Sequence, residues 1–323
     1  MRIHPLCRLA ALAMAIAAAS TLHAVDRPVS APVAAAASAA DYAANPAETF
    51  SVGTLKVQRY GDHGSPVILI PGLGSGAWVW KDTVEALRKN HVVYTVTLAG
   101  FDGVPVPTGN GNLFDRADDS LLQLIHGHKI AKPVMVGHSL GGTLALRFAG
   151  EHADLLAGVV AVDGLPVFPG MESVPQAQRV GIAGGVRSKI AASTPEAFAA
   201  SQIAYMQKIG VIDPAAALRY GALNGRSDAK AVADYMADDL ISDLRPSLKN
   251  VNLPILEIAP YNAPDAAAIP MKATEAQKAE YYGSLLATAP NAKVVSISPA
   301  RHFAMLDQPE KFRQVLTDFI DRI

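Results

Sequence analysis

The chain has 323 residues, of which 50% are hydrophobic and 18% are charged, and its formal net charge is −1 at pH 7. This length and hydrophobic content are sufficient for one large α/β domain with an insertion. The near-zero charge, together with the lack of a basic stripe with interleaved aromatic residues, argues against a nucleic-acid-binding surface. The composition therefore favours a small molecule as the binding partner.

The N-terminal segment has the order of features typical of a secretory signal peptide. Basic residues within 1–8 precede a short apolar run over 9–19, which passes into small residues before Ala24. The sequence predicts a signal peptide over residues 1–24, cleaved after Ala24, and hence a periplasmic or secreted protein. The apolar run is too short to span a bilayer, so no stable membrane span is expected, with an uncleaved anchor as the alternative. The only cysteine, Cys7, lies inside this leader, so the mature chain has no disulfide.

Residues 25–48 are rich in alanine, proline and serine and contain few large apolar side chains. Such a segment cannot bury enough surface to offset the entropy that it loses on ordering. We therefore predict a disordered linker over 25–48, which tethers a folded domain that spans residues 49–323.

The folded domain shows the alternation of strands and helices that is typical of an α/β protein. Residues 49–60 alternate in strand fashion and predict an opening antiparallel hairpin. Between about 165 and 250 the alternation stops, and helical segments such as 195–210 and 214–221 replace it, which predicts a helical cap. The remaining strands, separated by helical stretches, are predicted at 67–70, 91–98, 133–137, 158–162, 254–259 and 293–297.

The pattern Gly137-x-Ser139-x-Gly141 lies where the apolar strand 133–137 passes into a predicted helix. A strand, a sharp turn and a helix in this order form a nucleophile elbow, in which a strained serine exposes its Oγ and the glycines permit close backbone contact. Ser139 is therefore the candidate nucleophile. The alternative is a tight turn in which the serine only caps the helix. His138 is expected to pack away from the cleft and is assigned no chemistry.

A serine nucleophile needs a general base and donors for the oxyanion, and the chain offers candidates for both. His302 follows the predicted strand 293–297, at the sheet edge where the sites of α/β proteins form. The glycine-rich turn 71–76 follows a buried strand, and the backbone N–H groups of Leu73 and Leu140 are the candidate oxyanion donors. Taken singly, His302 could be a solvated turn residue, and the glycine-rich turn 71–76 could instead bind a phosphate.

The turn Pro-Gly-Leu-Gly at 71–74, the sequence Gly-His-Ser-Leu-Gly-Gly at 137–142 and Arg-His-Phe at 301–303 occur in an order that resembles the α/β-hydrolase fold family. The resemblance spans about residues 49–323. It implies an eight-stranded, mostly parallel sheet with helices on both faces and a helical cap inserted after the sixth strand. It indicates the fold more specifically than the substrate.

The third member of the implied triad, the acid that orients His302, has two candidates. The family most often carries the acid after the seventh strand, where Asn262 occupies the usual place and Asp265 follows three residues later. Other members carry it at the end of the sixth strand, where this chain has Asp163. We favour Asp163 and keep Asp265 as the alternative acid, while the pair Asp163-Gly164 could also be an ordinary turn.

These residues predict a serine hydrolase that cleaves a carboxylic ester or a related acyl substrate through an acyl-enzyme. The first alternative is another reaction on the same triad: hydrolysis of a lactone, an amide or a carbon–carbon bond, or perhydrolysis. The second is a non-catalytic ligand-binding protein, although a receptor has no need of both Ser139 and His302. No cofactor is expected. No metal site is expected either, because His126 and His128 lack a third ligand nearby in the sequence.

Overall fold

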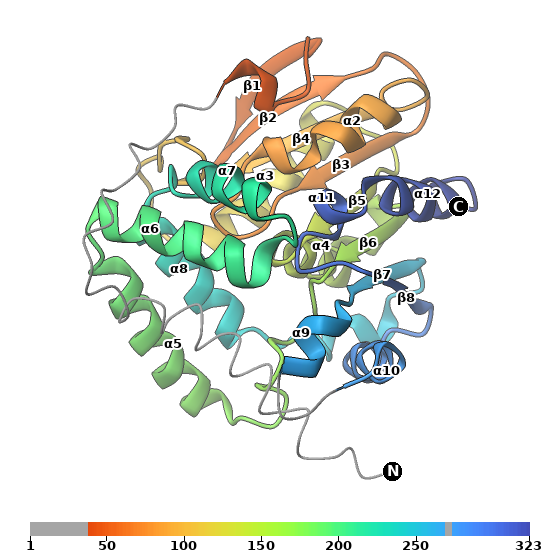
Figure 1. Cartoon of the computed structure of the whole chain (residues 1–323). Coiled ribbons are helices and arrows are strands. Elements are labelled where there is room, and N and C mark those ends of the chain that lie inside the picture. The colour runs from red at the N-terminus through yellow and green to blue at the C-terminus, as the bar shows by residue number, and fades with distance from the viewer. Residues whose placement is uncertain (1–37, 269–272) are drawn as a thin grey trace.

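The structure, a computed structural model, describes residues 38–268 and 273–323. Within these residues the strands form one eight-stranded sheet in the order β1-β2-β4-β3-β5-β6-β7-β8. Pairing is antiparallel between β1 and β2 and between β2 and β4, and it is parallel across the rest of the sheet. The predicted sheet is therefore confirmed (Figure 1). The strands are β1 (Glu48–Val52), β2 (Leu55–Tyr60), β3 (Pro66–Ile70), β4 (Val92–Leu98), β5 (Val134–His138), β6 (Gly158–Val162), β7 (Ile255–Pro260) and β8 (Ala292–Ile297).

The central strands are buried on both faces. In β3, Ile68 and Ile70 belong to the core on one face of the sheet, and Val67 and Leu69 belong to the core on the other. This alternation follows from the two-residue period of a strand and explains why these strands are continuously apolar. Helices supply much of each core and so cover both faces. The first core includes α3 (Leu113–Gly127), α4 (Leu140–His152) and α10 (Glu275–Leu285), and the second includes α2 (Lys81–Leu87) and α12 (Pro309–Ile320).

A helical insertion between β6 and β7 occupies the place expected for the cap. Thr194, Asp213 and Asp228 begin three of its helices as N-cap residues, and each side chain accepts a backbone N–H from three residues further on. Figure 1 shows the cap helices, in green and teal, gathered beside the sheet. They are α5 (Gln176–Ala191), α6 (Pro195–Tyr205), α7 (Pro214–Asn224) and α8 (Ala229–Ile241). Shorter helical pieces of the described chain are α9 (Ala263–Ala268), α11 (Ala304–Asp307), the 3-10 helices Ala39–Asp41, Ala77–Trp80, Ala153–Leu155 and Ser247–Asn250, and a π-helical turn at Met206–Gly210.

The structure differs from the prediction of a disordered linker in residues 38–48. Asp41 ends a short 3-10 helix, and its carboxylate accepts a hydrogen bond from Arg219 of α7 at 2.8 Å. Ala43 is buried, at 7% exposure. Specific contacts of this kind order an alanine-rich segment whose composition alone predicts disorder. The predicted signal peptide and the linker residues 25–37 lie outside the described residues, and in the described part no helix is long and apolar enough to cross a bilayer.

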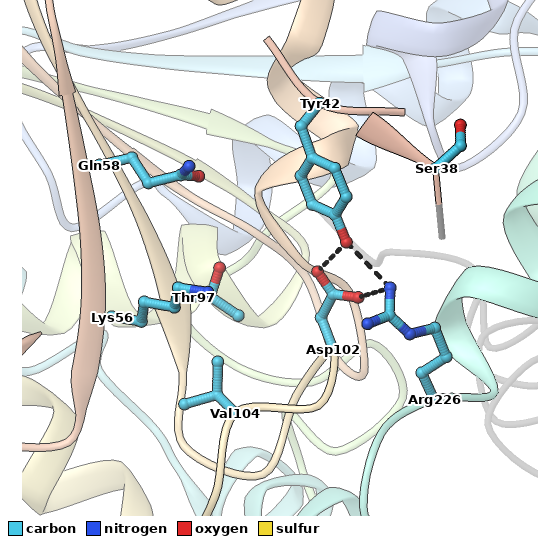
Figure 2. A pocket seen from close by; sticks show the side chains of 8 residues that line it. All are labelled: Ser38, Tyr42, Lys56, Gln58, Thr97, Asp102, Val104 and Arg226. Carbon is cyan, nitrogen blue, oxygen red and sulfur yellow. Dashed lines mark hydrogen bonds and ion pairs between the residues drawn. The ribbon is translucent and has the colours of Figure 1, made fainter. Parts of the chain in front are cut away.

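Three side chains from distant parts of the chain meet at a polar cavity of about 280 Å³ (Figure 2). The Tyr42 hydroxyl donates to Asp102 at 2.7 Å and accepts a hydrogen bond from Arg226 at 3.0 Å, and Arg226 also pairs with Asp102 at 3.0 Å. Burial, with the nearby Asp102 carboxylate, raises the pKa of Tyr42, so its hydroxyl remains a donor. These contacts join the N-terminal segment to the loop after β4 and to the cap.

Candidate active site

Ser139 lies at the turn between β5 and α4. Its backbone has φ 51° and ψ −122°, in the positive-φ region that few residues other than glycine adopt. The Ser139 N–H donates to the carbonyl of Val162 at 2.8 Å, which ties the turn to the neighbouring strand β6. A Cβ on Gly137 would lie 2.0 Å from the carbonyl oxygen of Gly141, so only glycine permits this contact of strand and helix. The turn therefore has the geometry expected of a nucleophile elbow.

His302 lies in the loop between β8 and α11, and contacts from three elements fix its position. Its backbone N–H donates to the carbonyl of Ile209, in the cap, at 3.2 Å. Its own carbonyl lies 3.0 Å from Nε2 of His138. Its ring nitrogen Nδ1 lies 2.5 Å from Oδ2 of Asp163. The imidazole is thus oriented through both its backbone and its ring, while its side chain keeps 16% exposure.

His138 is fully buried, as a side chain that packs away from the cleft would be, and it contacts His302. The two ring centroids lie 4.6 Å apart. His138 is fully buried, and this burial lowers the pKa of its imidazole well below the usual value, so the ring is neutral. Because a carbonyl oxygen only accepts hydrogen bonds, Nε2 of His138 carries the proton that it donates to His302. A neutral His138 therefore holds the backbone of the His302 loop.

The structure brings Asp163, and not Asp265, to His302. Asp163 directly follows β6, and its Oδ2 is the atom that lies 2.5 Å from Nδ1 of His302. Asp265, in α9, instead accepts two hydrogen bonds from the guanidinium of Arg301, at 2.7 and 2.8 Å. Of the two candidate acids, Asp163 is the one with the geometry to orient the imidazole.

The charge on Asp163 is maintained by its neighbours. Burial by itself raises the pKa of this carboxyl, but the positive charge of Lys278 and the contacts with His302 and Tyr282 outweigh burial and hold the pKa well below its usual range. Asp163 is therefore ionised at neutral pH and can stabilise an imidazolium. The hydrogen bonds from Arg301 also lower the pKa of Asp265. Both carboxyls therefore favour the ionised form, and the two aspartates differ in their partner, which is His302 for Asp163 and Arg301 for Asp265.

The glycine-rich turn after β3 runs beside the elbow. A Cβ on Gly72 would lie 3.1 Å from the Cβ of Ser139, so the backbone passes directly next to the serine. Leu73 is the next residue, and among the described residues none accepts a hydrogen bond from its N–H. Leu140 is the first residue of α4, where backbone N–H groups have no acceptor within the helix. Both residues are therefore close to Ser139, Leu73 through the neighbouring Gly72 and Leu140 as the next residue in the chain.

The cap braces this turn, a support that sequence reasoning missed. The Ser75 hydroxyl donates to Oδ1 of Asn224 at 2.8 Å, and the Ser227 hydroxyl donates to the Gly74 carbonyl at 2.7 Å. All three of these side chains are buried, where a hydrogen bond does not compete with water. Asn224 and Ser227 belong to no recognisable motif, so only the tertiary structure shows what they contact.

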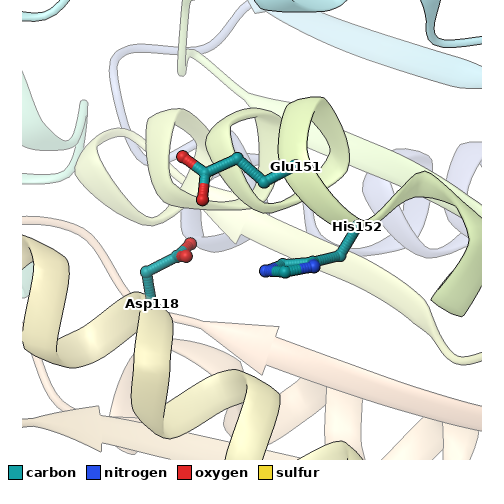
Figure 3. Close-up of side chains that lie close together, drawn as sticks. All are labelled: Asp118, Glu151 and His152. Carbon is teal, nitrogen blue, oxygen red and sulfur yellow. The ribbon is translucent and has the colours of Figure 1, made fainter.

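One cluster of possible metal ligands occurs among the described residues, at the end of α4 away from Ser139. Ligand atoms of Asp118, Glu151 and His152 lie within 4.8 Å of one another (Figure 3). Carboxylate and imidazole groups are suitable ligands for zinc. However, the guanidinium of Arg147 lies 3.5 Å from Glu151 and already supplies a positive charge. Burial also raises the pKa of Asp118 to about 7, so this carboxyl is partly protonated at neutral pH and a weak ligand.

Comparison with known proteins places this geometry in a family. The model of the alpha/beta hydrolase family matches residues 67–315. The pimeloyl-[acyl-carrier protein] methyl ester esterase of Aeromonas hydrophila is 24% identical over 285 residues, which cover 83% of this chain and 99% of the relative. The (lyso)-N-acylphosphatidylethanolamine lipase of Bos taurus is 27% identical over 190 residues, which cover 55% of this chain and 50% of the relative.

Solved structures show the same fold. A thermophilic esterase from Thermogutta terrifontis superposes with a TM-score of 0.68 at 21% identity, covering 85% of this chain and 98% of the esterase. The enol-lactonase from Burkholderia xenovorans has a TM-score of 0.65 at 20% identity, covering 85% of this chain and all of the lactonase. Since the family model spans most of the chain and the sheet has the fold of the solved hydrolases, the chain belongs to the alpha/beta hydrolase family and is an esterase-like hydrolase.

Proposed function

We propose that the protein is a serine hydrolase that cleaves a carboxylic ester or a related acyl substrate through an acyl-enzyme. The observation that carries the proposal is the distance of 2.5 Å between Nδ1 of His302, in the loop after β8, and Oδ2 of Asp163, which follows β6. Because Nδ1 is engaged by the carboxylate, Nε2 is the ring nitrogen that can act as a base. Ser139 is the proposed nucleophile, His302 the general base, and Asp163 the acid of the triad.

The proposed reaction begins when Oγ of Ser139 attacks the carbonyl carbon of the substrate and Nε2 of His302 takes the hydroxyl proton. The electron pair of the carbonyl bond moves to its oxygen, which the N–H groups of Leu73 and Leu140 stabilise. As the tetrahedral intermediate collapses, the bond to the leaving group breaks and the imidazolium returns the proton to the leaving oxygen. Water then attacks the acyl-enzyme by the same steps, which releases the carboxylic acid and regenerates Ser139.

The names of the relatives support an acyl substrate. The Aeromonas relative is named as a methyl ester esterase, and the Burkholderia structure as a lactonase. Both names describe hydrolysis at an acyl carbon bonded to oxygen. We therefore place a small-molecule oxygen ester first, and lactones, amides and carbon–carbon bonds become further arms of a substrate panel.

A fluorophosphonate probe tests the proposal, since it labels activated serines. The wild-type protein should be labelled once, on Ser139. Ser139→Ala should abolish labelling and lower kcat on acyl esters by about 10⁶-fold. Ser284→Ala, which removes an exposed hydroxyl on α10, is the matched control and should keep both labelling and activity. Labelling that persists in Ser139→Ala would contradict the proposal.

We also propose that the protein is exported, because residues 1–24 show the basic, apolar and small-residue order of a signal peptide. The mature chain should then begin near Val25, in the periplasm or outside the cell. Mass spectrometry of the protein from its native host measures this terminus. A chain that retains Met1 and resides in the cytoplasm contradicts export.

A further inference from the structure

Helix α10 engages the second oxygen of the Asp163 carboxylate. The hydroxyl of Tyr282 donates to Oδ1 of Asp163, and Nζ of Lys278 lies 3.9 Å from the same oxygen. Tyr282 and Lys278 are four residues apart in α10, so their side chains lie on one face of the helix. Lys278 is itself fixed, because its Nζ donates to the carbonyl of Pro260 at 2.5 Å and lies 5.1 Å from the centre of the Tyr282 ring.

Resting on the proposed function, we propose that Tyr282 and Lys278 are positioning residues, which fix the rotation of the Asp163 carboxylate and thereby aim its Oδ2 at His302. The terminal torsion of an aspartate is broad, so one hydrogen bond does not define the plane of the carboxylate. Contacts on both oxygens do define it. His302 occupies one oxygen and α10 occupies the other, which leaves the carboxylate a single orientation.

Burial makes these contacts stronger than they would be at the surface. The side chain of Asp163 is 11% exposed, and Tyr282 is 5% exposed. Glu257, the other carboxyl nearby, is fully buried in β7, and burial together with the Asp163 charge raises its pKa well above the usual value. Glu257 is therefore neutral and does not compete for Lys278. The titratable groups around Asp163 are Lys278 and Tyr282 from α10, Glu257 from β7, His302 from the loop after β8, His138 from β5 and Tyr205 from α6.

The first test removes the Tyr282 hydroxyl and keeps its ring. In Tyr282→Phe, kcat on an acyl ester should fall about 10-fold while KM stays unchanged, because the lost hydrogen bond is made to a charged group. Tyr281→Phe is the matched control, since it removes a neighbouring hydroxyl of α10 that donates to Glu172 instead. The control should keep the wild-type kcat. Equal kcat values in Tyr282→Phe and wild type argue against positioning.

The second test removes the charge of Lys278. Lys278→Met removes the positive charge that lowers the pKa of the Asp163 carboxyl. The acid limb of the profile of kcat/KM against pH should therefore move to higher pH, a change that a purely structural role would not cause. Lys293→Met, at an exposed position in β8, is the control and should leave the profile unchanged.

A spectroscopic measurement separates this inference from the proposed function. The Nδ1 proton of His302 should give a far-downfield proton resonance that moves in Tyr282→Phe and stays in Tyr281→Phe. If the wild type hydrolyses no acyl ester and takes no fluorophosphonate label, the proposed function fails while the resonance still tests positioning. If the wild type is active and kcat, acid limb and resonance are all unchanged in the variants, positioning alone is overturned. If Tyr282→Phe fails to fold, the position of the acid limb in the profile of kcat/KM against pH of Lys278→Met tests the positioning proposal.

Discussion

Replacing Asp163 by asparagine preserves the shape of the side chain and removes its charge. Asparagine tolerates the positive φ of 51° at this position better than most residues do. Its amide oxygen can still accept the hydrogen bond from Tyr282, so its amide nitrogen faces Nδ1 of His302 as a donor. Nδ1 then has to accept, the ring carries its proton on Nε2, and Nε2 can no longer take the proton of Ser139.

We expect kcat of Asp163→Asn to be about 10⁴-fold lower than that of the wild type, by analogy with the same change in the triad of serine proteases. This loss corresponds to about 5 kcal/mol of transition-state stabilisation. The free energy of unfolding should fall by less, roughly 1–3 kcal/mol, because one charge-assisted hydrogen bond is lost and no cavity is created. The effect on catalysis should therefore exceed the effect on stability.

Steady-state hydrolysis of a chromogenic acyl ester measures kcat, and urea unfolding followed by circular dichroism measures stability. Asp265→Asn is the matched control, because Asp265 bonds Arg301 at 2.7 Å and does not contact His302. Its kcat should stay within about 10-fold of the wild type. The assignment of the acid would be refuted if kcat of Asp163→Asn fell less than tenfold below the wild type. It would also be refuted if kcat fell further in Asp265→Asn than in Asp163→Asn. An unfolded Asp163→Asn would instead identify this residue as a structural turn.

Three other substitutions test contacts and burial described above. Tyr42→Phe removes a hydrogen bond to the charged Asp102, so urea unfolding should show a loss of about 2 kcal/mol, and an unchanged midpoint would contradict this role. Ser75→Ala removes one of the two hydrogen bonds between the cap and the glycine-rich turn, while Ser227 still donates to Gly74, and should lower kcat/KM about 5-fold in ester hydrolysis, without a change in the melting temperature larger than a few degrees. Burial raises the pKa of Asp118 in the folded state to about 7, above the unfolded value of about 3.9, so the wild type should lose stability as pH rises between these values. Asp118→Asn should remove that loss and be more stable than the wild type at pH 8 by up to ~4 kcal/mol, but not at pH 4.

The elbow and the sheet could be predicted because their signals are local. Gly137, Ser139 and Gly141 determine the turn through their own backbone requirements, and an apolar run such as 67–70 is buried on both faces wherever it lies in a parallel sheet. His302 could be placed because the end of a parallel strand identifies an edge of the sheet. In each case the information lies within a few residues of the feature.

The proposed acid and its supports depend on contacts between distant segments, so the sequence left the acid open and did not indicate its supports. Asp163 and Asp265 both follow strands, and what separates them is Arg301, whose guanidinium engages Asp265 in the fold. Tyr282 and Lys278 have only helical spacing in common, which is usual on any helix. Likewise, residues 38–48 are ordered by partners far along the chain, which composition does not reveal.

The hydrogen bond between the His302 N–H and the Ile209 carbonyl joins the loop of the proposed base directly to the cap. Phe303 donates in the same way to Gly210, and the Arg301 guanidinium donates to the carbonyls of Gln207 and Val211. A chimera that takes its cap from a relative must therefore keep these four carbonyls within reach of the loop 301–303. We expect substitutions in the π-helical turn Met206–Gly210 that alter the substrate range to change kcat as well as KM. A shift of this turn would move the His302 loop that is hydrogen-bonded to it.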